Sequence, residues 1–214
     1  MDIAALLKNI DLYLLDQLLK GRITKESKIL DAGCGTGRNS RFFIENGYQI
    51  KGFDPNEESI VALQKEYPSY KGKYVVSDIE SFKGRDGYDF VICNAVLHFA
   101  ESHRHFRTMI DGLSSCLNPT GVLFIRMTSE FAVPKPYEVN KDGRSELPDG
   151  TERYLLSKKE LSGAMARNRL YFVEPLKTIN VNDERSMSTI VLTKHERIGL
   201  DLGWLSPDQN PIMK

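Results

Sequence analysis

The chain of 214 residues lacks the features that mark several classes of protein. It has no basic excess, since 29 lysines and arginines balance 29 aspartates and glutamates, whereas proteins that bind nucleic acid usually are basic. No apolar run approaches the roughly 18 residues of a membrane span. The N-terminus also lacks the basic start and unbroken apolar core of a signal peptide. The composition therefore predicts a soluble cytoplasmic protein with neither a nucleic-acid nor a membrane partner.

Cysteine is scarce as well. Cys34, Cys93 and Cys116 are odd in number and far apart, which fits free thiols in a reducing compartment and gives no zinc spacing. His103 and His105 are two residues apart, so on a helix they would not share a face. We therefore expect no metal site.

What the sequence does contain is an alternation of short apolar strands with amphipathic helices. An opening helix should end near Gly21, and later helices are expected over 38–46, 55–67, 106–117 and 157–170. Five strands are predicted at 28–32, 48–54, 74–78, 88–94 and 121–127. Two more, at 171–181 and 186–194, lie too close for a parallel crossover and should pair antiparallel. The pattern predicts an α/β fold, a mostly parallel sheet between two layers of helices.

The predicted elements divide the chain into three parts. Residues 1–27 form an N-terminal helical segment, 28–195 the main domain and 196–214 a C-terminal tail. Within the main domain, residues 128–156 contain several prolines and glycines without clear periodicity. Loops of this length are often binding segments, so we interpret 128–156 as a lid or insert.

The stretch KILDAGCGTGRNS places Gly33, Gly35 and Gly37 directly after the first strand. A nucleoside-triphosphate loop ends in Gly-Lys-Ser/Thr, but here Arg38 and Asn39 follow the last glycine. A dinucleotide loop would need its third glycine at position 38. Two interpretations remain from these residues: a tight turn that needs glycine only for its backbone angles, or a loop that a ligand without phosphate approaches closely.

Three aspartates lie at the ends of the first three predicted strands, where ligands bind in such sheets. Asp54 is able to accept hydrogen bonds from both ribose hydroxyls, or to cap a helix that starts at Pro55. Asp78 is able to accept from the amine of adenine while Ile79 packs on the ring, or is simply a solvated acid. Asp31 would repel a pyrophosphate and attract a cation. Together they favour a nucleoside with a cationic tail.

The chain resembles the class I S-adenosylmethionine-dependent methyltransferases in five segments and in their order along the sequence. These segments are LDAGCGTGRNS, GFDPNEESI, VVSDIESF, YDFVICNAVLHF and LNPTGVLFIRM. The likeness is looser to their tellurite-resistance-type, small-molecule branch. It implies a three-layer Rossmann-like sandwich with a seven-stranded sheet whose last strand is antiparallel. The cofactor-binding residues that it implies are Asp31, Gly33, Cys34, Gly35, Gly37, Asn39, Asp54, Pro55, Asp78, Ile79, Asn94 and Ala95.

The resemblance also implies a reaction, the in-line transfer of a methyl group from S-adenosylmethionine to a small molecule, which leaves S-adenosylhomocysteine. His98 follows the fourth strand and is the candidate catalytic residue. Arg126, Phe131 and Tyr137 lie at or after the fifth strand, where they either face the substrate or pack within the lid. We expect a monomer or a homodimer.

Two other functions remain open on the sequence. One is a non-catalytic module that binds the cofactor and works through a partner. The other is a nicotinamide-dependent oxidoreductase, which Arg38 in place of glycine disfavours. DNA modification is disfavoured too, because the chain has NAVL where nucleobase amino-methyltransferases have an Asn/Asp-Pro-Pro-aromatic stretch.

Overall fold

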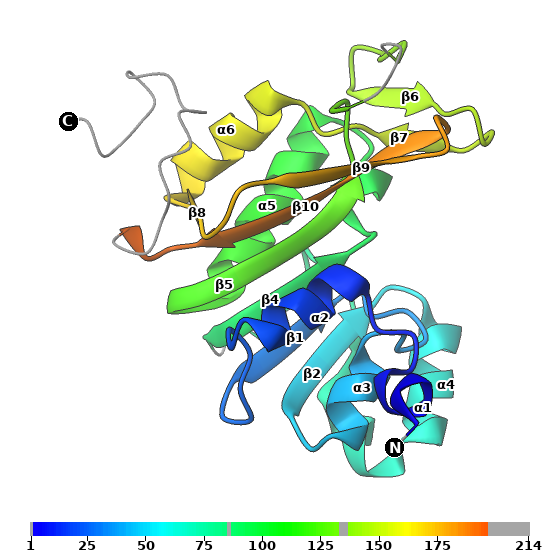
Figure 1. Ribbon diagram of the computed structural model, residues 1–214, viewed down its shortest axis with the longest axis vertical. Coiled ribbons are helices and arrows are strands. Elements are labelled where there is room, and N and C mark those ends of the chain that lie inside the picture. The colour runs from blue at the N-terminus through cyan, green and yellow to red at the C-terminus, as the bar shows by residue number, and fades with distance from the viewer. Residues whose placement is uncertain (1, 85–86, 133–136, 197–214) are drawn as a thin grey trace.

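The computed structural model describes residues 2–84, 87–132 and 137–196, and Figure 1 shows one twisted sheet with helices on both faces. Within these ranges the sheet has eight strands, in the order β3-β2-β1-β4-β5-β10-β8, and β9 also pairs with β10. Its strands are β1 (Lys28–Ala32), β2 (Gln49–Asp54), β3 (Tyr74–Val76), β4 (Tyr88–Asn94), β5 (Leu117–Thr128), β8 (Tyr171–Phe172), β9 (Lys177–Val181) and β10 (Arg185–Thr193).

The predicted α/β class and the antiparallel last strand are confirmed. Strands β1 to β5 pair in parallel, and β10 runs antiparallel to β5, β8 and β9. The predicted strand over 171–181 is divided into β8 and β9 around Pro175, which has no amide to donate. This division makes eight strands out of the seven expected. The strand order reverses between β1 and β4, so ligands are expected at the carboxyl ends of these two strands.

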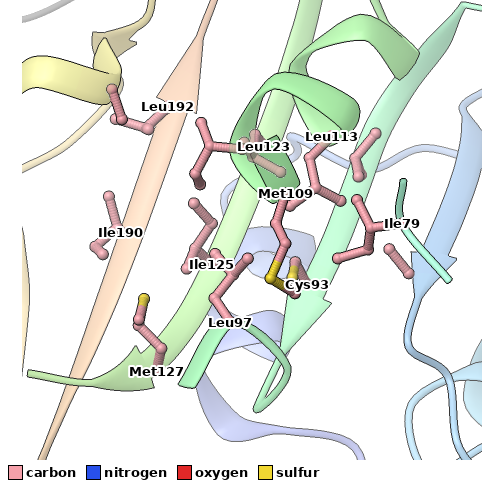
Figure 2. Packing of buried hydrophobic residues seen from close by; sticks show 14 of the residues in the cluster. Ile79, Cys93, Leu97, Met109, Leu113, Leu123, Ile125, Met127, Ile190 and Leu192 are labelled. Atoms are coloured by element: carbon pink, nitrogen blue, oxygen red, sulfur yellow. The ribbon is translucent and has the colours of Figure 1, made fainter. Parts of the chain in front are cut away.

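Helices cover the two faces of the sheet in two separate apolar clusters. The helices are α1 (Ile3–Leu7), α2 (Leu12–Leu19), α3 (Ser40–Glu45), α4 (Glu57–Glu66), α5 (His103–Cys116), α6 (Lys158–Asn168) and the 3-10 turns η1 (Pro68–Lys73) and η2 (Leu97–Phe99). Leu14, Phe43 and Leu63 from α2, α3 and α4 share one cluster. Figure 2 shows the other, where Met109 and Leu113 of α5 face the sheet. The clusters separate because alternate strand residues point to opposite faces.

Two expectations about the helices are wrong. The opening helix is divided into α1 and α2, and Asp11 caps α2 by accepting a hydrogen bond from the Tyr13 amide at 2.9 Å. Helix α4 begins at Glu57, because the Asn56 side chain caps it through the Ser59 amide at 2.7 Å. Pro55 therefore lies before the cap, which leaves Asp54 free of a capping role.

The segment 128–156 contains a small hairpin that the sequence did not indicate. It consists of β6 (Arg144–Glu146) and β7 (Glu152–Tyr154), which pair antiparallel in a sheet of their own. Strands of three residues are too short to show a periodic pattern. In the part of the chain that the structure describes, no helix is both long and apolar enough to cross a membrane.

Candidate functional site

The glycine-rich turn joins β1 to α3 at the carboxyl edge of the sheet. The amides of Gly33 and Cys34 both donate to the carbonyl oxygen of Phe53 in β2, at 2.8 and 3.0 Å. Cys34 itself is buried, and burial raises the pKa of its thiol. The turn is therefore fixed to the neighbouring strand, and its thiol stays protonated and unreactive.

The three glycines differ in what surrounds them, although all have positive φ. A Cβ at Gly33 would clash with the Val96 side chain, and one at Gly37 would clash with the Leu63 side chain. A Cβ at Gly35 would meet no heavy atom within 4 Å. The outer glycines thus allow close packing, while the middle one faces open space that a ligand is able to enter.

Asp54 holds the middle of this turn. Its Oδ2 accepts a hydrogen bond from the Gly35 amide at 2.8 Å, and its Oδ1 accepts one from the Asn56 amide at 2.9 Å. A carboxylate oxygen has further lone pairs, so each oxygen remains able to accept from a hydroxyl group. The side chain that was predicted to bind ribose therefore also shapes the loop.

Asp31 is an acid in an apolar setting. It is 2% exposed, and its Oδ2 accepts a hydrogen bond from the Ser40 hydroxyl at 2.7 Å. Burial raises the pKa of Asp31 to about 6; the Ser40 hydrogen bond opposes this shift and the charge of Asp54 adds to it. A cationic group beside Asp31 would stabilise the carboxylate and reverse the shift.

The third aspartate lies at the exposed end of the site. Asp78 Oδ1 accepts from the Ser81 amide at 2.7 Å, and hydrogen bonds from Ser81 lower the pKa of Asp78. Ile79 is buried instead: it packs against Gly112 of α5 and points into the core in Figure 2. Its side chain therefore has little surface left for the predicted contact with an adenine ring, and a part of Ile79 in cofactor binding stays a prediction.

Asn94 ends β4 with unsatisfied polar atoms. Both Oδ1 and Nδ2 of Asn94 are buried without a hydrogen-bond partner among the described residues. Ala95, the next residue, has φ 61° and donates its amide to the carbonyl of Arg126 at 2.8 Å. Buried amides are normally paired, and backbone strain of this kind gathers at functional sites. These features fit a bound group that offers both a donor and an acceptor.

Two predicted site residues, Asn39 and Arg126, contact the N-terminal segment at Asp11, and their contact with a ligand stays a prediction. Asn39 Oδ1 accepts a hydrogen bond from the Asp11 amide at 3.0 Å. Asp11 Oδ2 accepts from Arg126 at 3.1 Å and from Arg38 at 3.3 Å. Asp11 is 2% exposed and was not predicted as a site residue. The sequence marks Asp11 only as an acid before LYLL, in the position of a helix cap. Such a position does not predict contacts with residues far along the chain.

His98 lies in η2, directly after β4. It is 8% exposed, and its Nδ1 is buried without a partner in the described ranges. Burial lowers the pKa of His98 to about 4, and the charges of Arg153 and Arg185 contribute. The ring is therefore neutral near pH 7 and is a weak base.

Phe131 and Tyr137 lie along the start of β10. Phe131 packs against the core, and its carbonyl accepts a hydrogen bond from the Ser186 hydroxyl. Tyr137 is half-buried, and burial raises the pKa of its phenol. Packing against the core accounts for the position of Phe131. A contact of either residue with a substrate stays a prediction.

Comparison with known proteins identifies the family. A family model described as "Tellurite resistance protein TehB" matches residues 16–146, more than half of the chain. The chain belongs to the TehB family. Its predicted resemblance to class I S-adenosylmethionine-dependent methyltransferases, tellurite-resistance branch, is thereby confirmed.

Sequence similarity to individual proteins supports the assignment of the chain to the TehB family. A "Probable S-adenosyl-L-methionine-dependent methyltransferase TehB" from Haemophilus influenzae is 34% identical over 118 residues, which cover 54% of this chain and 41% of the relative. A trans-aconitate 2-methyltransferase from Rhizobium leguminosarum is 28% identical over 122 residues, 56% of this chain and 45% of the relative. The chain thus spans less than half the length of these two relatives.

Solved structures share the fold at low sequence identity. A methyltransferase from Methanosarcina mazei superposes with a TM-score of 0.66 at 18% identity, over 83% of this chain and 97% of the other. Magnesium protoporphyrin IX methyltransferase from Synechocystis, solved with S-adenosylmethionine, gives 0.62 at 18% identity, over 85% and 76%. The Rossmann-like fold is therefore confirmed. The methyltransferase class and S-adenosylmethionine as cofactor are supported by the family and by the TehB relative described above.

Proposed function

We propose that this chain binds S-adenosylmethionine and transfers its methyl group to a small-molecule acceptor. The observation that carries the proposal is the turn between β1 and α3, where Asp54 holds the Gly35 amide at 2.8 Å beside open space. Two features support it: the Asn94 side-chain amide, which has no partner in the described part of the chain, and the raised pKa of Asp31. Both suit a ligand with an amino group and a carboxylate. When bound, the cofactor supplies the methyl group; the chain supplies binding and orientation.

In this proposal, three aspartates at the carboxyl edge of the sheet bind different parts of the cofactor. Asp31 would accept from the cationic amino group, Asp54 from the ribose hydroxyls and Asp78 from the adenine amine. The buried turn and the packed η2 would keep water from the reacting atoms, which favours attack by the acceptor. His98 is a neutral group that contacts the acceptor in this proposal, and its low pKa makes it a poor general base.

A small acceptor is supported by what the relatives are named for. One relative is a trans-aconitate 2-methyltransferase, and one structural neighbour was solved with 1,6-didemethyltoxoflavin. The segment 128–156 is proposed as the acceptor-side insert, since its hairpin lies against η2.

Methyl transfer is tested with S-adenosylmethionine that carries a labelled methyl group. The protein is incubated with panels of phenols, amines, thiols, carboxylic acids and oxyanions. We expect label in at least one acceptor, with S-adenosylhomocysteine formed in equal amount. Tight binding of the donor without transfer to any class would instead support the non-catalytic binding module.

A further inference from the structure

A cation, an aromatic ring and a histidine lie together on the acceptor side of the site. The guanidinium carbon of Arg153 lies 4.9 Å from the centre of the Phe99 ring. The Phe99 ring in turn meets the His98 ring edge to face, with centres 4.6 Å apart. Phe99 is 56% exposed although it is large and apolar. The exposed Phe99 ring therefore contacts both the Arg153 guanidinium and the buried His98 ring.

Arg153 belongs to the hairpin in the insert. It lies in β7, opposite Ser145 of β6, and β7 packs beside η2. Figure 1 shows the hairpin near the end of β5 and the start of β10, on the carboxyl side of the sheet. The insert therefore brings a positive charge to the strand ends where the methyl donor is proposed to bind.

Arg153 differs from the arginines around it. Arg144 pairs with Glu152 at 2.8 Å, and Arg185 pairs with Asp149 at 3.0 Å. Within residues 2–84, 87–132 and 137–196, no carboxylate forms an ion pair with Arg153; its guanidinium donates only to the Glu152 carbonyl at 2.9 Å. A guanidinium has five donors in a fork that matches a carboxylate, and most of these remain unused here.

His98 adds a second unused group. Its Nδ1 is buried and without a partner among the residues that the structure describes. The His98 ring contacts Phe99, and the charges of Arg153 and Arg185 help to lower its pKa. A neutral imidazole with a free ring nitrogen is able to donate one hydrogen bond. It is not suited to removing a proton at pH 7. The arrangement thus fits an acceptor that arrives already ionised.

We propose, on the basis of the function above, that the acceptor is a small carboxylic acid whose carboxylate binds Arg153 and the ring N–H of His98. One carboxylate oxygen attacks the methyl carbon, and the bond between carbon and sulfur breaks with its electron pair moving to sulfur. The products are a methyl ester and the neutral thioether. No proton is transferred, so the reaction needs no base.

The test begins with binding rather than turnover. Protein saturated with S-adenosylhomocysteine is titrated calorimetrically with acids and their matched amides: benzoate and benzamide, phenylacetate and phenylacetamide, succinate and succinamide. We expect at least one acid to bind about tenfold more tightly than its amide. Arg153→Gln should remove that difference and Arg153→Lys should restore part of it. Arg104→Gln, at an exposed arginine of α5, should leave it unchanged.

The same variants are then compared in turnover. With an acid that is methylated, Arg153→Gln should raise KM about tenfold or more and change kcat less. The proposal is overturned if no acid binds or reacts, if amides do so equally well, or if Arg153→Gln and Arg104→Gln behave alike. Methylation of phenols or amines alone would overturn it while leaving the proposed methyltransferase function intact. Failure to bind S-adenosylmethionine would instead contradict that function.

Discussion

At the scale of single residues, the site contains buried polar groups that have few partners or none. Asp31 is buried with one hydroxyl partner, and its pKa is raised to about 6. Asn94 has both amide atoms unpaired among the described residues. Such groups reduce the stability of the ligand-free protein and favour a ligand that satisfies them. At Asp31, both the loss of stability without ligand and the gain in ligand affinity are measurable.

Asp31→Asn should make the ligand-free protein more stable above pH 6. The folded-state pKa is raised above the ordinary value of 3.8, so the wild type loses stability as pH rises from about 4 to about 6. The variant has no such loss and should gain roughly 1–3 kcal/mol at pH 8. Urea denaturation at pH 4 and pH 8 measures this difference.

The same substitution should weaken binding of S-adenosylmethionine, and wild-type affinity should fall below pH 6 as Asp31 becomes protonated. Asp183→Asn, at an exposed acid between β9 and β10, is the matched control and should change neither quantity. If Asp31→Asn gains stability without losing affinity for S-adenosylmethionine, the cationic group of that ligand does not bind beside Asp31.

At the scale of elements, the turn between β1 and α3 combines packing with access. Gly33 and Gly37 approach Val96 and Leu63, whereas Gly35 faces open space. Gly47, which follows α3, also has positive φ, and a Cβ added there would meet nothing within 4 Å. Gly35 and Gly47 therefore share a positive φ and an open position for a Cβ, and they differ in their nearness to the proposed ligand.

Alanine at Gly35 and at Gly47 should thus separate stability from binding. Each variant should lose about 1 kcal/mol of unfolding free energy, because alanine is disfavoured at positive φ. Only Gly35→Ala should reduce affinity for S-adenosylhomocysteine, because its methyl group enters the ligand space. Equal affinities for the two variants, measured calorimetrically, would contradict the assignment of this loop.

The elements also show where sequence reasoning succeeds. Strand β4 was predicted at its observed bounds. Asp31, Asp54 and Asp78 lie at or near the carboxyl ends of β1, β2 and β3, as predicted, whereas their part in binding stays a prediction. Neither Asp11 nor Arg153 was predicted. The contacts of Asp11 are far away in sequence, and Arg153 lies in a strand of only three residues. The predicted helix start at Pro55 was wrong because Asn56 is the better cap.

At the scale of the whole molecule, the N-terminal segment is tied to the far half of the sheet. Glu174, between β8 and β9, accepts hydrogen bonds at 2.6 Å from Lys20, Arg22 and Lys177. Burial alone would raise the pKa of Glu174, but these three cations outweigh it and lower the pKa to about 2. This cluster holds the end of α2 against the sheet, at a distance in sequence that no local pattern reveals.

Glu174→Gln should reduce the unfolding free energy by about 2 kcal/mol at pH 7, since three cations would lose their carboxylate. Because the pKa is lowered from its ordinary value of 4.5, the wild-type advantage is present above pH 4.5 and is lost as pH falls toward 2. Denaturation series at both ends of this range measure it. Glu146→Gln, at an exposed acid of β6, should have little effect at either pH. An advantage that is constant with pH would show that the carboxylate charge is not responsible.

The central claim is that Asp54 and the glycine-rich turn between β1 and α3 form the binding site of the methyl donor. Calorimetric titration of S-adenosylmethionine and S-adenosylhomocysteine into the wild type, Asp54→Ala and His98→Ala tests it most directly. We expect sub-millimolar binding to the wild type, a loss of about tenfold or more in Asp54→Ala, and a much smaller change in His98→Ala. No binding of either ligand to the wild type, or equal losses in the two variants, would contradict the account.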